Sequence, residues 1–169
     1  KVAISGIRDV SAVDFAYAKQ IGFRIKLVGT AEPGRMPRMQ TCLLPMSTQL
    51  AKVDGVLNAV EFDADPVGSV VLTGPGAGSG ATSSAVLSDL VDLACDRIPF
   101  TFGRPVATLA DGSAFENGGG PDTPFYVRLM VVDKPGVLAD ITSVLQIHDI
   151  SVESMLQQGR APQDTVALV

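Results

Sequence analysis

The chain has 169 residues, which is enough for one ordinary domain and part of a second. Apolar residues make up 46% and aromatic residues only 5%, so the core is expected to be aliphatic. The net charge of −5 without any Lys/Arg run excludes the positive patch that nucleic-acid binding needs, and no apolar stretch is long enough to predict a membrane span.

The first part of the chain predicts short strands around one helix. Ser11 is followed three residues later by Asp14, a capping-box pattern that indicates a helix start, and Gly22 stands where a left-handed C-cap is favoured. Asp14 is therefore interpreted as a helix N-terminal acid rather than a catalytic group. The expected elements are strands at 1–7, 23–28 and 39–44 and a helix at 12–21.

The middle of the chain predicts a hairpin and a second helix. Asp54-Gly55 is a turn signal, and two apolar runs follow it between residues 56 and 73. The glycine-rich segment 74–80 then opens a helix at about residues 82–95, with Val86, Leu90 and Leu93 on one face. Together these elements predict an α+β fold, a mostly antiparallel sheet with helices on one face.

The last part predicts a second, smaller domain. Residues 97–122 carry few periodic features and are interpreted as a linker between domains at 1–96 and 123–169. Strands are expected at 125–132, 150–156 and 165–169, with a helix at 137–148 that His148 closes. This order is β-α-β-β, which predicts a partial ferredoxin-like domain that is cut off in its last strand.

Two loops are candidate binding sites. Gly74, Gly76 and Gly78 precede a helix N-terminus, where backbone N–H groups favour an anion. The segment is neither a P-loop nor a Gly-x-Gly-x-x-Gly fingerprint, and the residues alone favour a tight structural turn over an anion-contacting loop. The turn at Asp133, Gly136, Val137 and Leu138 opens the next helix and could hold a carboxylate or be an ordinary βα turn.

The sequence offers no familiar set of catalytic or metal-binding residues. With one histidine, no Ser/His/Asp or Cys/His arrangement and no common zinc site can be assembled. Cys42 and Cys95 are expected to be two buried thiols rather than a disulfide. Lys26 could bind substrate, although a lysine on the exposed face of a strand is the more common case.

Two blocks of the sequence carry family patterns. The first block consists of Gly6-Ile7, Asp14, Ala18, Gly22, Arg24-Ile-Lys-Leu27, Asn58-Ala-Val60, Gly74-Pro-Gly-Ala-Gly78, Thr82 and Asp89-Leu90, and it resembles homoserine dehydrogenases. The second block, residues 125–158, contains Phe125-Tyr-Val-Arg-Leu and Asp133-Lys-Pro-Gly-Val-Leu, and it resembles an ACT domain.

The resemblance implies NADP- or NAD-dependent interconversion of L-aspartate 4-semialdehyde and L-homoserine, in threonine, methionine and isoleucine biosynthesis. It implies a cytoplasmic homodimer or homotetramer, a cofactor held mainly by an upstream Rossmann domain, and Gly74, Gly76 and Gly78 beside that cofactor. The proton-donor lysine of the family is expected upstream, or at Lys1 if a stretch is deleted after Ile4.

The ACT resemblance implies an amino-acid effector, with threonine as the candidate, at Asp133, Gly136, Val137 and Leu138. The chain alone is expected to be inactive. The alternative to a fragment of the enzyme is an ACT regulatory module or a dimerisation scaffold without activity of its own.

Overall fold

The structure is a computed structural model that describes every residue except 1, 101, 110–122, 158 and 160–163. The chain divides into two compact units, called unit 1 (residues 1–7 and 22–118) and unit 2 (residues 8–21 and 119–169). The predicted α+β class is confirmed, with three α-helices among the described residues and small, mostly antiparallel sheets.

Unit 1 contains a three-stranded sheet with strand order β1-β3-β2. Strands β2 (Phe23–Thr30) and β3 (Arg38–Pro45) pair antiparallel along their full lengths, and β1 (Ala3–Ile4) joins β3 in parallel. The expected strands at 23–28 and 39–44 are thereby confirmed. Apolar and basic residues alternate in β2, and Ile25 on its apolar face is buried. The 3-10 helix Leu50–Lys52, which contacts β2, contributes the buried Ala51.

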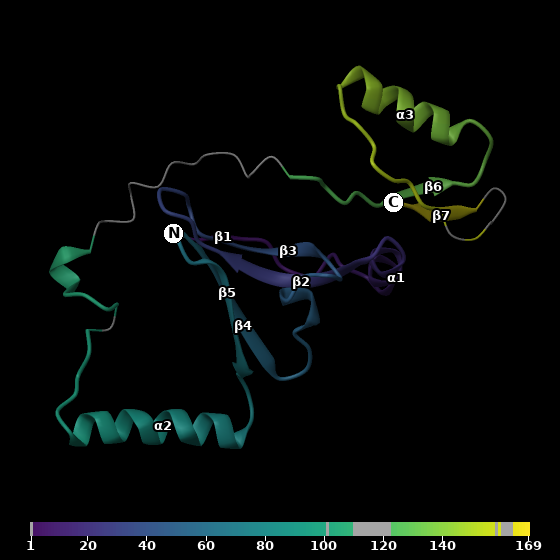
Figure 1. Cartoon of the computed structure of the whole chain (residues 1–169). Helices are drawn as coiled ribbons and strands as arrows, with labels where there is room; N and C mark the ends of the chain where they lie inside the picture. Colours follow the sequence, from purple (N-terminus) through teal and green to yellow (C-terminus); the bar gives the residue numbers. More distant parts are fainter. Residues whose placement is uncertain (1, 101, 110–122, 158, 160–163) are drawn as a thin grey trace. The chain divides into compact units, whose positions relative to one another are not determined.

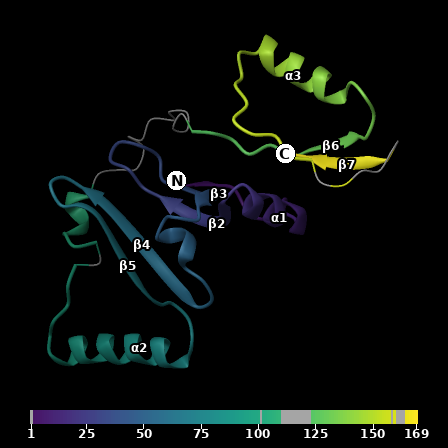
Figure 2. The same ribbon diagram turned by 45° about the vertical axis from the view of Figure 1, so that its right-hand side comes forward.

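The predicted hairpin is confirmed as β4 (Leu57–Ala64) and β5 (Gly68–Pro75), which leads into helix α2 (Ser79–Ala94) in Figure 2. Gly55 takes a φ of +65°, as the turn before β4 requires. Helix α2 begins three residues earlier than predicted, because Gly78 rather than a later residue is its N-cap.

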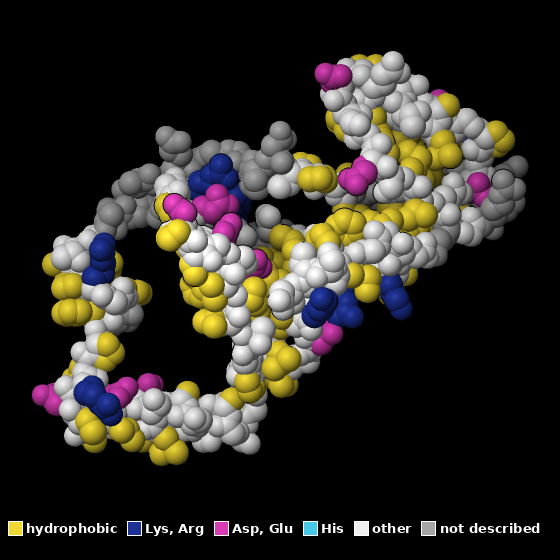
Figure 3. Space-filling model, viewed as in Figure 1, with side chains coloured by type: hydrophobic (Ala, Val, Ile, Leu, Met, Phe, Trp, Pro, Cys, Tyr) yellow, Lys and Arg dark blue, Asp and Glu magenta, His cyan; other side chains and the backbone are white. Residues whose placement is uncertain are grey.

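Apolar side chains of unit 1 lie largely at the surface. No residue of α2 is buried, and Leu87, Leu93 and the hairpin residue Leu72 are each 60% or more exposed. Figure 3 shows hydrophobic side chains at the surface over α2 and over the hairpin. Cys42 and Cys95 are free thiols as expected, but the prediction that both are buried is wrong, since Cys95 is exposed at the end of α2.

Unit 2 joins helix α1 (Ala12–Gln20) to the C-terminal segment. That segment contains β6 (Leu129–Val132), α3 (Val137–Ile147) and β7 (Thr165–Leu168), and β6 and β7 lie side by side as an antiparallel pair. A 3-10 helix, Val106–Thr108, occupies part of the expected linker, and residues 110–122 of that linker lie outside the described residues.

Two strand predictions in this segment are wrong in extent. Residues 125–128 are not in a strand, because β7 pairs only with residues 129–132 of the preceding segment. Residues 150–156 form no ladder either. Pairing there is limited to backbone bonds between Leu156 and Val169 and a bridge between Gln157 and Leu168.

No described helix combines the length and the hydropathy that would let it cross a bilayer.

Candidate functional site

The glycine-rich loop connects strand β5 to helix α2. Its backbone is held at one point, where the amide of Gly76 donates to the carbonyl of Val56 over 2.8 Å. Gly78 has a φ of +109° and caps α2 without any side-chain hydrogen bond, and no acidic residue lies in the first turn. The loop therefore places uncompensated N–H groups at the positive end of a 16-residue helix.

Gly76 has a second, structural reason to be glycine. A Cβ atom built there would lie 1.6 Å from Nδ2 of Asn58, so the Asn58 side chain occupies the space that any larger residue would need. Gly74 differs, because a Cβ atom there meets nothing within 4 Å. The loop thus combines a tight packing position at Gly76 with an open position at Gly74.

A groove of about 260 Å³ runs beside this loop. It is lined by residues of both hairpin strands and by the loop itself: Asn58, Ala59, Val60, Leu72, Thr73, Gly74, Pro75 and Gly76. The groove is open to solvent and mostly apolar, with the Asn58 amide as its polar side chain from β4.

The second candidate loop opens helix α3. Gly136 is the N-cap of α3 with a left-handed φ of +96°, which only glycine adopts without strain. The Asp133 carboxylate accepts a hydrogen bond from the side-chain amide of Gln157 over 3.4 Å. The backbone amide of Asp133 donates to the backbone carbonyl of Asp164. Leu138 is 46% exposed, so the turn presents both backbone N–H groups and an apolar side chain to solvent.

Lys26 has a structural partner. Its ammonium donates to the Val53 carbonyl and, over 2.9 Å, to the Asp54 carboxylate, which also pairs with Arg24 at 2.6 Å. Hydrogen bonds from Lys26 and then Arg24 lower the pKa of Asp54 below its usual value. The two basic residues of β2 therefore fasten the segment that leads into the hairpin.

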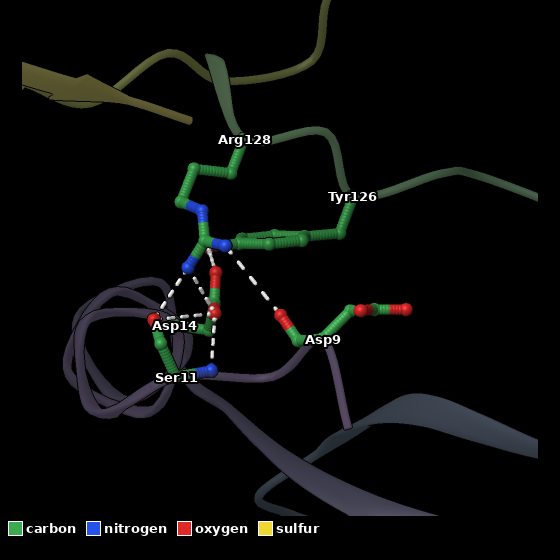
Figure 4. A network of polar contacts seen from close by, with 5 residues as sticks. All are labelled: Asp9, Ser11, Asp14, Tyr126 and Arg128. Atoms are coloured by element: carbon green, nitrogen blue, oxygen red, sulfur yellow. Dashed lines mark hydrogen bonds and ion pairs between the residues drawn. The ribbon is translucent and has the colours of Figure 1, made fainter. Parts of the chain in front are cut away.

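Unit 2 contains a polar network that the sequence pattern alone did not reveal. Asp14, predicted as a helix N-terminal acid, forms the expected capping box with Ser11, whose backbone amide and hydroxyl donate to it over 2.7 and 2.8 Å. The same carboxylate accepts from the Tyr126 hydroxyl over 2.8 Å and forms an ion pair with Arg128. Figure 4 shows these residues converging, with Arg128 also donating to the Asp9 carbonyl.

Burial and charge act in opposite directions on this network. Desolvation raises the pKa of Asp14, but the hydrogen bonds from Ser11 and Tyr126 and the charge of Arg128 outweigh it and lower the pKa below its usual value. Desolvation and the bond to Asp14 raise the pKa of Tyr126. Asp14 is therefore ionised, nearly buried and bound by four donors at neutral pH.

Comparison with known proteins places both segments. A family model described as homoserine dehydrogenase matches residues 1–91, more than half of the chain. The chain belongs to the homoserine dehydrogenase family. A second model, described as ACT domain, matches residues 125–167.

Similar members of the homoserine dehydrogenase family come from several bacteria. The enzymes of Neisseria gonorrhoeae and Pseudomonas aeruginosa are each 34% identical to this chain, over 98% and 97% of it. Among solved structures, homoserine dehydrogenase from Thiobacillus denitrificans is 35% identical, with a TM-score of 0.65 over 99% of the chain. The S. aureus enzyme is 26% identical, with a TM-score of 0.56 over 96%.

The chain spans about two fifths of the length of these relatives, 40% of the two sequences and 39% and 40% of the two structures. Within the family match lie α1, the sheet of unit 1, the hairpin and the glycine loop with most of α2. Lys1, the alternative proton donor, lies outside the described residues.

Proposed function

We propose that this chain is part of an NAD(P)-dependent homoserine dehydrogenase that interconverts L-aspartate 4-semialdehyde and L-homoserine. The supporting observation is that residues 1–91 match this family and include a glycine loop that leads into the N-terminus of helix α2. In this reaction the cofactor carries the hydride, and protein groups position and protonate the substrate. In this proposal the chain supplies part of the enzyme's scaffold and the glycine loop between β5 and α2.

Gly74, Gly76 and Gly78 are proposed to lie beside the cofactor. A glycine loop at a helix N-terminus lets backbone amides approach an anionic or polar group closely. Gly76 also accommodates Asn58, so the loop's shape is fixed by packing while Gly74 stays open to a ligand. The groove beside Asn58 and Leu72 offers space for a part of the cofactor or substrate.

Gly74→Ala in the complete enzyme tests this role. The added methyl group meets nothing within 4 Å in this chain, so contacts within the chain do not account for a penalty. We expect the KM for NADPH or NADH to rise at least about tenfold, equivalent to ~1.4 kcal/mol of lost binding. Gly6→Ala is the matched control, because a Cβ atom at Gly6 also meets nothing within 4 Å and Gly6 lies outside the glycine loop and α2. Equal KM values for both variants would refute the assignment.

The ACT segment is proposed to bind an amino-acid effector, with threonine as the first candidate. The turn at Asp133, Gly136, Val137 and Leu138 offers N–H groups for a carboxylate and an exposed apolar side chain. Calorimetric titration of the complete enzyme with threonine is the test. Absence of heat and of inhibition would leave the segment as a dimerisation element.

The 169-residue chain alone is proposed to be inactive. The sequence holds no Gly-x-Gly-x-x-Gly fingerprint, and the chain covers about 40% of its relatives. The active form is proposed to be a cytoplasmic homodimer or homotetramer. NADPH oxidation by this purified chain with aspartate semialdehyde would contradict the proposal.

A further inference from the structure

The buried side chains of unit 2 come from helix α1 and strand β7. Among the described residues of this unit, those that are buried are Asp14, Tyr17, Ala18, Val166 and Leu168. Helix α3 contributes no buried residue, although it lies in the same family match as β7. Within this unit, the helix that shares buried side chains with β7 is therefore α1 rather than α3.

Helix α1 reaches β7 at its outer edge, the edge that faces away from β6. There the backbone of Leu156 pairs with that of Val169. Backbone groups two residues apart on a strand point to the same edge, so the carbonyl of Ala167 also points away from β6. The hydroxyl of Tyr17, a residue that is 1% exposed, donates to this carbonyl over 2.8 Å. Tyr17 thereby provides a partner for a backbone group that β6 does not reach.

The start of α1 is held by two side chains of the C-terminal segment. Arg128 forms an ion pair with Asp14, whose side chain is 5% exposed. The Arg128 guanidinium also donates to the Ser11 hydroxyl and the Asp9 carbonyl (Figure 4). Tyr126 donates to the other carboxylate oxygen of Asp14 over 2.8 Å. The segment directly before β6 thus contacts both residues of the capping box of α1 through charge-assisted bonds.

We propose that residues 8–21 and the C-terminal segment form one discontinuous folding unit, in which the C-terminal segment carries a docking surface for α1. This docking surface consists of Tyr126, Arg128 and the outer edge of β7. It fits a helix that starts with a Ser-x-x-Asp capping box and carries a tyrosine three residues after the acid, and residues 8–21 are its occupant. All of these contacts lie within unit 2, so the proposal rests on no cofactor, substrate or effector.

Native-state amide hydrogen exchange of the 169-residue chain, at neutral pH and low urea concentrations, tests the proposal. Amides that open in one cooperative step share an opening free energy and a urea dependence. We expect the amides of Ala18 in α1 and Val166 in β7 to open together, with protection factors within about threefold of each other. Ile25 in β2 is the reporter for unit 1, and its amide should open independently.

Asp14→Asn should lower protection at Ala18 and Val166 by a common factor of at least about tenfold, because asparagine cannot form the ion pair with Arg128. The Ile25 amide should stay within about twofold of wild type. Asp9→Asn is the matched control, since it removes a carboxylate just before the same helix, whereas Arg128 contacts Asp9 through the backbone carbonyl. In this control both amides of unit 2 should stay within about twofold of wild type.

Tyr17→Phe tests the contact with β7 and decides the proposal if Asp14→Asn unfolds unit 2. Loss of the hydrogen bond to Ala167 should lower protection at Ala18 and Val166 together, by about three- to tenfold. A fall at Ala18 with Val166 at wild-type rates, in either variant, would show that α1 opens alone and would overturn the proposal. An effect of Asp9→Asn as large as that of Asp14→Asn would overturn the docking role of Tyr126 and Arg128.

Discussion

Replacing Arg128 with methionine should destabilise unit 2 far more than the loss of a surface ion pair. The Asp14 side chain is 5% exposed and that of Arg128 is 27% exposed, so the pair is largely shielded from water. Removing one member of a buried pair costs ~3–5 kcal/mol, because the other charge stays buried without compensation. Ser11 and Tyr126 still donate to Asp14, so we expect a loss of about 2–3 kcal/mol in the free energy of unfolding.

Tyrosine fluorescence during urea unfolding is the appropriate assay. The chain contains two tyrosines and no tryptophan. Both Tyr17 and Tyr126 lie in unit 2, so the signal reports on that unit alone. Asp14→Asn and the double variant complete a cycle, in which we expect a coupling energy of about 1–3 kcal/mol.

Arg97→Met is the matched control for this experiment. Its ion pair with Asp92 joins side chains that are 64% and 43% exposed, and such pairs contribute less than ~1 kcal/mol. If Arg128→Met lowers the free energy of unfolding no more than Arg97→Met does, or if the cycle shows no coupling, the role of the shielded ion pair between Arg128 and Asp14 is refuted.

Three further predictions follow from the same structure. Because the folded pKa of Asp14 lies below 3.8, its ionised form stabilises unit 2 above that pH. The urea midpoint should therefore fall below about pH 4, and fall less in Asp14→Asn. Gly76→Ala places a Cβ atom 1.6 Å from the Asn58 side chain and should lower the unfolding free energy by about 1–3 kcal/mol in calorimetry, with recovery in a Gly76→Ala/Asn58→Ala double variant. Cys95 is exposed and should be alkylated faster than the half-buried Cys42 in timed mass spectrometry, and equal rates would contradict the exposure.

Local signals in the sequence were sufficient for the start of α1 in unit 2 and for the turn before the hairpin of unit 1. Ser11 with Asp14 predicted the start of α1, and Asp54-Gly55 predicted the turn before the hairpin, because capping and turn geometry depend on neighbouring residues only. The start of α2 was predicted too late, since the N-cap is a glycine with no side-chain signal.

Strands in the ACT segment were harder to predict from pattern. Residues 150–156 carry the apolar residues Ile150, Val152 and Leu156 at even positions. A strand also needs a partner for its backbone groups, and pairing reaches only Leu156 and Gln157. The spacing of apolar residues along a segment does not show which other segment will pair with it. The domain boundaries predicted at residues 96 and 123 remain a prediction, and unit 2 in the structure also includes α1.

The polar network at Asp14 was only half predictable. Its capping role is local, but Arg128 lies 114 residues away, and no local pattern pairs the two. The signal that could have suggested it is that Tyr126 and Arg128 stand two residues apart directly before β6. Similarly, the reason for glycine at position 76 lies in Asn58, on the opposite hairpin strand.

Isotope tracing in the complete enzyme tests the central claim most directly. Incubation of L-aspartate 4-semialdehyde with NADPH or NADH deuterated at the transferable position should give homoserine one mass unit heavier, with the label on C4. Homoserine without the label, or no homoserine at all from a folded, cofactor-saturated enzyme, would contradict the proposed function of this chain.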